Sequence, residues 1–335
     1  MTETESQSQQ KRGHLVIFYL LTTAIACMGW IPFAAYQVGL LHWRIPVEIP
    51  IVAQYSPTLA AFILIAFEGG RDGLRTFLKS FVRWRIGVQW YVVALLTAPL
   101  MGISLIALHA FEGKYVPTIA SLQGWQFHVA AFIENLGGVS GGTASSSGLF
   151  HSLARWASWG VWPAALVILG LATANGGLSE EAGWRGYALT RLLPGRRALM
   201  ASLWVGLMWG LWHTGPAFWI GIFQKNWSVV AVPIEYTLGT VPLSVLICWV
   251  FINAKRSLLP GILFHASYNS TFFFLTALWT PGKPVVSVLE WLAATIGAAL
   301  LAILIGRQSL LARSSTAKGA SRLESTRELR PVVVK

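Results

Sequence analysis

Apolar stretches of roughly twenty residues recur along the chain, separated by shorter polar connections. They cover about residues 15–36, 49–67, 89–111, 198–222, 228–251, 257–279 and 285–306, and another begins near residue 161. A helix needs about 20 apolar residues to cross the hydrocarbon core of a bilayer. The pattern therefore predicts an all-α, polytopic membrane bundle of about eight transmembrane helices.

The segment at residues 69–88 has a different pattern. Its apolar residues recur at three-and-four spacing and its basic residues fill the other side, which is typical of an amphipathic helix lying in the membrane interface. The apolar set is Leu74, Phe77, Leu78, Phe81 and Val82, and the basic set is Arg71, Arg75, Lys79, Arg83 and Arg85. A solvated positive loop remains the alternative interpretation.

The remaining segments predict the domain organisation. Residues 1–14 form a polar N-terminal tail, residues 15–306 a membrane-embedded domain with its core at about 161–280, and residues 307–335 a basic disordered tail. The long connection at 112–160 contains a Gly/Ser-rich run at 137–148, which favours a flexible linker. Three tryptophans, at positions 156, 159 and 162, indicate re-entry through the aromatic belt.

Composition supports a membrane protein and gives it an orientation. Hydrophobic residues make up 55% of the chain and charged residues only 11%, whereas a soluble domain carries about 25% charge. The net charge of +12 does not indicate nucleic-acid binding, because the basic residues gather in loops. Alternate loops differ in basic content, which predicts that both termini are cytoplasmic. The richer set holds Lys11, Arg12, Arg71, Arg75, Lys79, Arg83, Arg85, Arg191, Arg196, Arg197, Lys255, Arg256, Arg307 and Arg313; the poorer holds Arg44, Lys114, Arg155, Lys225 and Lys283.

Charge returns inside the apolar run that begins near residue 161. Glu180, Glu181 and Arg185 lie in the stretch at 176–187. On a helix, Glu181 and Arg185 share a face in the order that favours an ion pair. Glu180 points about 100° away and is left unpaired. Charge within a hydrocarbon layer is costly and is usually functional, although a helix end in headgroups and water would also explain these residues.

Few other strongly polar groups lie deep within the predicted spans. They are His213, and the pair His265 and Asn269, which stand four residues apart on one helix face. At a rise of about 1.5 Å per residue, these groups and Glu180 lie roughly 12 to 20 Å below one membrane surface, whereas Arg185 is shallower and nearer the entrance. One shared intramembrane site is therefore expected. Interhelical hydrogen bonding without catalysis is the alternative.

These residues form three ordered motifs. They are Glu180-Glu181-x-x-x-Arg185, Trp209-x-x-x-His213 and His265-x-x-x-Asn269. The set resembles the CPBP family, the CAAX protease and bacteriocin-processing (Abi) proteins, which include type II CAAX prenyl endopeptidases. The resemblance covers about residues 69–280. Trp209 replaces the usual Phe of the second motif.

The resemblance implies an intramembrane endopeptidase whose site opens to the cytoplasmic side, in the plasma membrane of a prokaryote. It implies that Glu180 and His213 activate water, that His265 and Asn269 hold the oxyanion, and that Glu181 and Arg185 support the site. A mechanism without cofactor is favoured, because no His-Glu-x-x-His motif is present. Zinc held by Glu180, His213 and His265 is the alternative.

The expected partners are membrane lipids and a protein or peptide substrate, possibly lipid-modified, but no nucleic acid. Two other functions stay open from the sequence. One is a non-catalytic membrane immunity or scaffold protein, in which the polar residues only hold helices together. The other is a proton-coupled transporter, in which Glu180 and the histidines relay protons; against it, the chain has no internal repeat.

Overall fold

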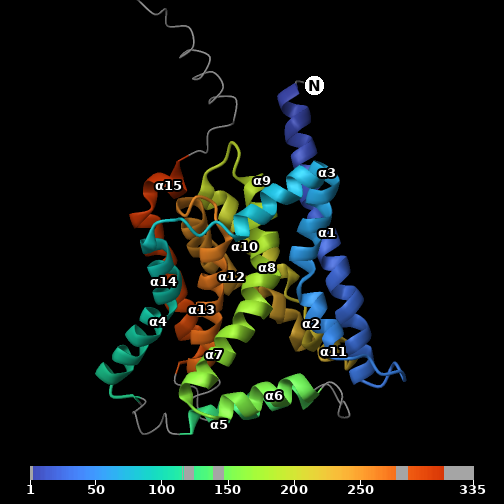
Figure 1. Ribbon diagram of the computed structural model, residues 1–335, viewed down its shortest axis with the longest axis vertical. Helices are drawn as coiled ribbons and strands as arrows, with labels where there is room; N and C mark the ends of the chain where they lie inside the picture. Colours follow the sequence, from blue (N-terminus) through green and yellow to red (C-terminus); the bar gives the residue numbers. More distant parts are fainter. Residues whose placement is uncertain (1–2, 115, 117–123, 139–146, 277–285, 313–335) are drawn as a thin grey trace, which may run out of the picture.

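The computed structural model describes residues 3–114, 116, 124–138, 147–276 and 286–312, and these are mostly helical, with no strand among them (Figure 1). Long apolar helices pack side by side into a bundle. The helices are α1 (Glu3–Gln37), α2 (Glu48–Gln54), α3 (Ser56–Phe81), α4 (Val88–Phe111), α5 (Trp125–Gly138), α6 (Ser147–Ser158), α7 (Val161–Ala172), η2 (Thr173–Leu178), α8 (Ser179–Glu181), η3 (Ala182–Leu189), α9 (Thr190–Leu192), α10 (Ala198–Trp212), α11 (Pro216–Phe223), η4 (Trp227–Ala231), α12 (Val232–Asn253), α13 (Leu258–Thr276), α14 (Val288–Ile305) and α15 (Arg307–Leu311).

The membrane spans can be compared with the predicted number. Within the described ranges, five helical segments are long and apolar enough to cross a bilayer, at 13–37, 88–111, 161–192, 227–253 and 288–305. A sixth arises if α2 and α3, which meet at a 55° bend, form one broken span. The predicted span at 198–222 is divided, because α10 ends at Trp212 and Pro216 starts α11. The all-α membrane bundle is confirmed, while the number of eight stays a prediction.

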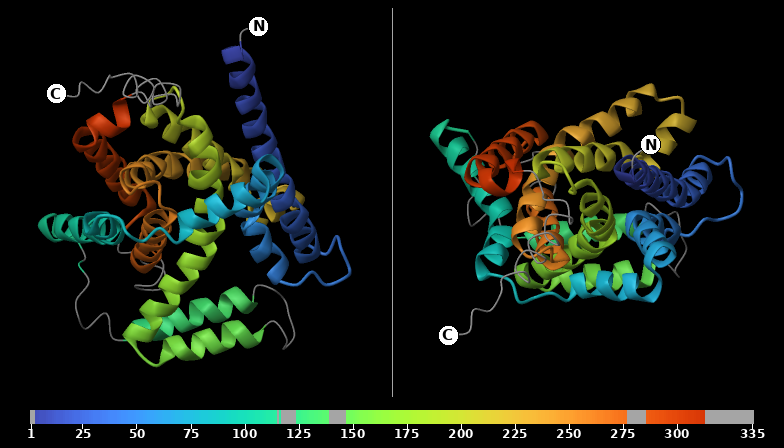
Figure 2. Two further views of the ribbon diagram at one scale, coloured as in Figure 1. Left: turned by 45° about the horizontal axis from the view of Figure 1, so that its top comes forward. Right: turned by 90° about the horizontal axis from the view of Figure 1, so that it is seen from above.

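Helix α1 begins at Glu3, so the polar N-terminal residues are helical and precede the apolar span that starts at Gly13. One part of the predicted organisation needs correction. The connection at 112–160 contains two helices, α5 and α6, which lie side by side across one end of the bundle (Figure 2). The linker interpretation overlooked a helical repeat of apolar residues on either side of the Gly/Ser run. The middle of that run, at 139–146, and the tail from 313 onward lie outside the described residues.

The helices α5 and α6 belong to a second hydrophobic cluster beside the main one. Trp125, Val129 and Ile133 recur every four residues along α5 and are all buried. Phe150 and Ala154 on α6 face the same cluster, together with the first half of α7. Burial of these apolar faces holds the pair against the base of the helix that carries the acidic motif.

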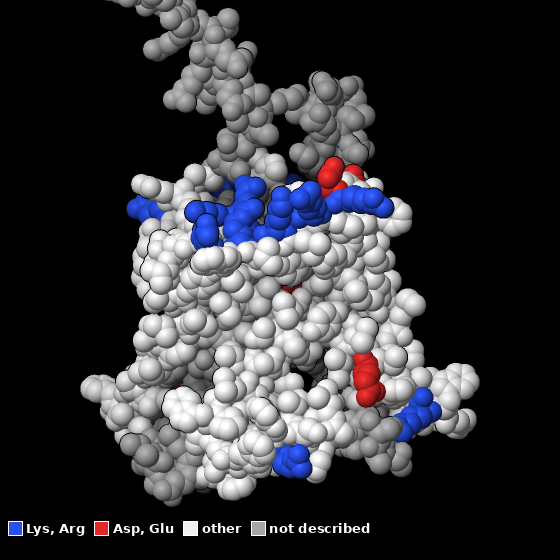
Figure 3. Space-filling view, in the orientation of Figure 1, with Lys and Arg blue, Asp and Glu red and all other residues white. Residues whose placement is uncertain are grey.

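The predicted interfacial helix is the second half of α3. The backbone leaves helical geometry at Gly70, where φ is 52°, and α3 then continues to Phe81 in a new direction. A positive φ of this kind costs glycine little, which explains the break at this position. Lys and Arg side chains gather in a band at this end of the molecule, above a broad surface almost free of charge (Figure 3). The uneven distribution of basic residues among the loops is also the basis for predicting cytoplasmic termini, and that orientation stays a prediction.

Candidate active site

The helix that begins at Val161 changes its winding where it carries the acidic motif. Two π-helical segments, η2 and η3, flank the single α-helical turn α8, which consists of Ser179, Glu180 and Glu181. π-Helical turns insert extra residues into a helix and often occur at functional sites. All three residues of α8 are buried, so the local winding directs both carboxylates into the protein.

Glu180 accepts hydrogen bonds from two neutral donors on other parts of the chain. Gln54 Nε2 donates to Oε1 at 2.9 Å, and the indole Nε1 of Trp209 donates to Oε2. The side chain is only 2% exposed. Glu180 has no ion-pair partner among the described residues, as predicted, but its carboxylate is held at both oxygens.

Glu181 is the centre of an ionic network. Its Oε1 accepts a hydrogen bond from Arg185 Nη1 at 2.9 Å and another from His265 Nδ1 at 2.8 Å. Glu181 and Arg185 are 0% exposed. The predicted ion pair is confirmed, and the alternative that these charges lie in headgroups and water is wrong. The Arg185 guanidinium stacks 4.6 Å over the Trp209 ring. Its depth relative to the membrane surface stays a prediction.

His213 caps the end of α10 beside the acid. Its Nδ1 donates to the carbonyl oxygen of Trp209 at 2.8 Å, since a carbonyl can only accept. This leaves Nε2 as an acceptor in the neutral ring. The imidazole stacks on the Tyr236 ring, with centroids 4.4 Å apart and planes 10° apart. His213 is also within electrostatic range of Glu180 and of His265, so Trp209 joins the acid and His213 into one assembly.

His265 and Asn269 extend from α13 toward η2. Their Nε2 and Nδ2 atoms lie 3.0 Å and 2.8 Å from the position that a Cβ atom would take on Gly176. Two nitrogens from different side chains thus converge on one point next to a glycine. The absence of a side chain at Gly176 lets η2 approach α13 closely at this point.

The structure therefore brings together all the residues that the motifs single out. In the parts of the chain that the structure describes, no three or more His, Cys, Asp and Glu side chains are grouped so that they could hold a metal ion. Glu180, His213 and His265, which the sequence offered as zinc ligands, do not form such a group among the described residues.

Two residues of the site were missed by the sequence analysis. Gln54 is the last residue of α2, beside the bend that leads into α3, and Tyr236 lies in the first turns of α12. A lone amide in an apolar run, close to Pro57, was the available signal for Gln54. Tyr236 had no comparable signal, because an aromatic residue near the end of a span is common.

Comparison with known proteins bears on the same segment. Residues 161–271 match the family model of the type II CAAX prenyl endopeptidase Rce1-like proteins. This segment is similar to those proteins over the matched residues. The Rce1-like segment contains all three motifs, and the family resemblance stated from them is confirmed over this range.

A curated relative extends the similarity beyond the Rce1-like segment. The chain is 22% identical over 259 residues to CAAX prenyl protease 2 of Methanococcus maripaludis, which covers 76% of this chain and 82% of the relative. Together with the apolar helices, the two similarities support an integral membrane protease that acts on protein or peptide substrates.

Proposed function

We propose that the chain is an intramembrane endopeptidase in which Glu180 activates water for hydrolysis of a peptide bond. The observation that carries this proposal is the convergence of one acid, two imidazoles and one carboxamide from three separate helices on a buried region around Trp209. Peptide hydrolysis needs a base for water and hydrogen-bond donors where negative charge develops. The assembly contains both.

In the proposed reaction, Glu180 accepts a proton from water while the water oxygen attacks the carbonyl carbon. Gln54 and the Trp209 indole orient the carboxylate, because each holds one of its oxygens and leaves a further lone pair on both. His213 Nε2 orients the same water or shares its proton. The proton on Glu180 then passes to the leaving nitrogen as the carbon–nitrogen bond breaks, which yields a carboxylic acid and an amine.

We propose that the tetrahedral oxyanion accepts hydrogen bonds from His265 and Asn269. The Asn269 amide is a donor in any state, whereas His265 Nε2 donates only when the ring carries both protons. Glu181 accepts a hydrogen bond from the Nδ1–H of His265 and so stabilises the doubly protonated ring. Arg185 neutralises Glu181 from the other side. Glu181 and Arg185 are therefore positioning residues that act through His265.

The proposed reaction needs no metal, and each step uses side chains of this chain. Substrates are membrane-associated proteins or peptides, with lipid-modified, prenyl or CAAX-like proteins as the preferred class, since the relative named above is a CAAX prenyl protease. We place the protein in the plasma membrane of a prokaryote with both termini in the cytoplasm, in line with the band of basic residues at one end (Figure 3).

The experiment compares membranes carrying the wild-type chain, Glu180→Gln, or the matched control Glu48→Gln. Glu48 is an exposed carboxylate on α2, so its change removes the same charge away from the site. New peptide ends should appear with the wild type and the control and disappear with Glu180→Gln. Equal peptide ends in all three membranes would remove the proposal and favour the scaffold function, and proton-coupled uptake in vesicles would favour transport.

A further inference from the structure

The second half of α3 carries a feature that the proposed protease function does not use. An open hollow of about 600 Å³ is lined by Arg71, Leu74, Arg75, Leu78, Lys79, Phe81 and Val82. All of these residues lie between the break at Gly70 and the C-cap residue Val82. The hollow is lined by none of the residues of the acidic motif.

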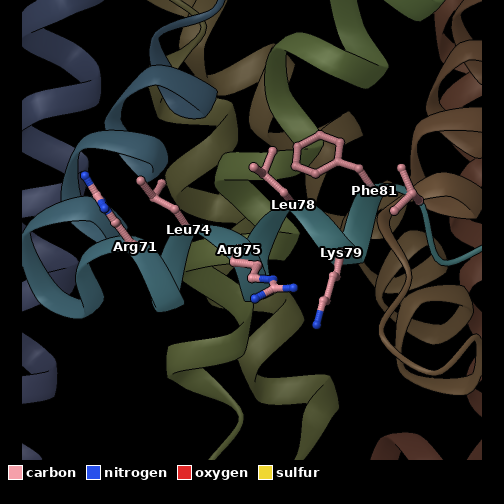
Figure 4. Close-up of a pocket in the computed structure, with 7 residues that line it drawn as sticks. Arg71, Leu74, Arg75, Leu78, Lys79 and Phe81 are labelled. Atoms are coloured by element: carbon pink, nitrogen blue, oxygen red, sulfur yellow. The ribbon is translucent and has the colours of Figure 1, made fainter.

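The basic side chains at the hollow are exposed and unpaired. Arg71, Arg75 and Lys79 recur every four residues, so they follow one side of the helix. Within the described ranges no carboxylate forms an ion pair with any of them, although Asp72 is exposed on the same turn. In Figure 4, Arg75 and Lys79 project away from the side on which Leu74, Leu78 and Phe81 lie. These cations are available to an anion from outside the protein.

Apolar side chains adjoin these cations. Leu78 is 50% exposed and Val82 is 69% exposed. Leu78 follows Arg75 by three residues and Val82 follows Lys79 by three, so Arg75 and Lys79 each have an exposed apolar neighbour on the helix surface. The buried face of the helix is separate, since Phe77 packs edge-on against Phe62 and Phe81. The outward surface thus pairs positive charge with exposed hydrocarbon.

The end of the segment is fixed to the bundle, so the surface has a defined position. The Ser257 hydroxyl donates to the carbonyl of Arg83 at 2.7 Å, and Lys255 Nζ donates to the carbonyl of Arg85 at 3.2 Å. The Arg83 side chain donates to the Lys255 carbonyl in return. These contacts hold the helix end against the turn between α12 and α13, at the level of the basic band (Figure 3).

We propose that this surface binds the headgroup of one anionic phospholipid. The phosphate contacts Arg75 and Lys79, and an acyl chain lies along Leu78 and Val82. A free phosphate ion would use the cations but would leave the adjoining apolar side chains unused. Lysine and arginine near a membrane surface attract anionic lipid, and the attraction falls off within a Debye length. The proposal is independent of the protease function.

The test is lipid titration of the full-length protein, released from neutral detergent and analysed by native mass spectrometry. The probes are a phosphatidylglycerol, a phosphatidylcholine of the same acyl chains, and glycerol phosphate. The variant is Arg75→Gln with Lys79→Gln, and the matched control is Arg197→Gln with Arg256→Gln, which removes two exposed basic residues outside the hollow. A single charge reversal, Lys79→Glu, serves as a second variant.

We expect the wild type and the control to bind one phosphatidylglycerol in preference to phosphatidylcholine. The double variant should lose roughly 30-fold in phosphatidylglycerol affinity, the equivalent of two surface charges, and Lys79→Glu should abolish the preference. Equal losses in the variant and the control would show a diffuse effect of the whole basic band and would overturn the site. Competition by glycerol phosphate as effective as the lipid would overturn the lipid assignment.

Discussion

A methyl group added at position 176 tests the proposed oxyanion site most directly. Gly176 is buried on η2, and the Cβ of alanine would lie 2.8 Å from Asn269 Nδ2 and 3.0 Å from His265 Nε2. Carbon atoms do not tolerate such separations, so the carboxamide and the imidazole have to shift by a few tenths of an ångström or more.

The expected effect on catalysis is large and the effect on stability is small. Loss of one oxyanion donor lowers the rate by about 100- to 1000-fold, and we expect kcat/KM of Gly176→Ala to fall by about 100-fold. Replacing a helical glycine by alanine contributes up to about 1 kcal/mol of stability, and overpacking costs about 1 to 3 kcal/mol. These terms oppose each other, so the variant should remain folded.

Gly170→Ala is the matched control for this change. Gly170 lies on α7, and a Cβ atom there would meet nothing within 4 Å. The assay is cleavage of a farnesylated peptide ending in a CAAX sequence, measured in proteoliposomes alongside thermal unfolding. The control should cleave at the wild-type rate. If Gly176→Ala cleaved within about threefold of the wild type while folded, His265 and Asn269 would not form the oxyanion site at this point.

Three further predictions follow from the contacts of the site. Gln54→Met removes a donor to the proposed catalytic carboxylate and should lower kcat by about tenfold or more with KM unchanged. Thr58→Val, which removes a hydrogen bond between the adjoining segments α3 and η2, should not; equal kinetics of the two would contradict the positioning role. Arg185→Met leaves a buried carboxylate unneutralised and should reduce the free energy of unfolding by about 3 to 5 kcal/mol. Adding Glu181→Leu should restore most of that stability without activity, and recovered activity would argue against a role through the histidine. Chelators should leave cleavage unchanged, and loss that zinc restores would establish a metal mechanism.

The distribution of polar contacts around Glu180 has a consequence for engineering. Its two hydrogen-bond donors come from segments 126 and 29 residues away in the chain. The geometry of the acid therefore depends on how α2 and α10 pack against α8. Changes at the bend between α2 and α3 are expected to alter activity even where they leave the motifs intact.

Much of the architecture was predictable because it follows from local patterns. Long apolar runs identify membrane helices since lipid requires apolar side chains and internally paired backbones. The ion pair between Glu181 and Arg185 was also predictable from a local pattern, because residues four apart on one helix are neighbours whatever surrounds them. The three motifs also singled out the polar groups that lie together in the site.

Other features were decided only by the tertiary structure. Gln54 has the same local pattern whether it faces lipid, another helix or the carboxylate of Glu180, and only the packing of α2 against α8 distinguishes these cases. The burial of Arg185 and the contact of His265 with Glu181 likewise depend on where helices cross. The sequence by itself determined which residues are apolar, charged and locally adjacent. The crossing of the helices decided which of them meet, because contacts between distant residues depend on the relative positions of whole helices.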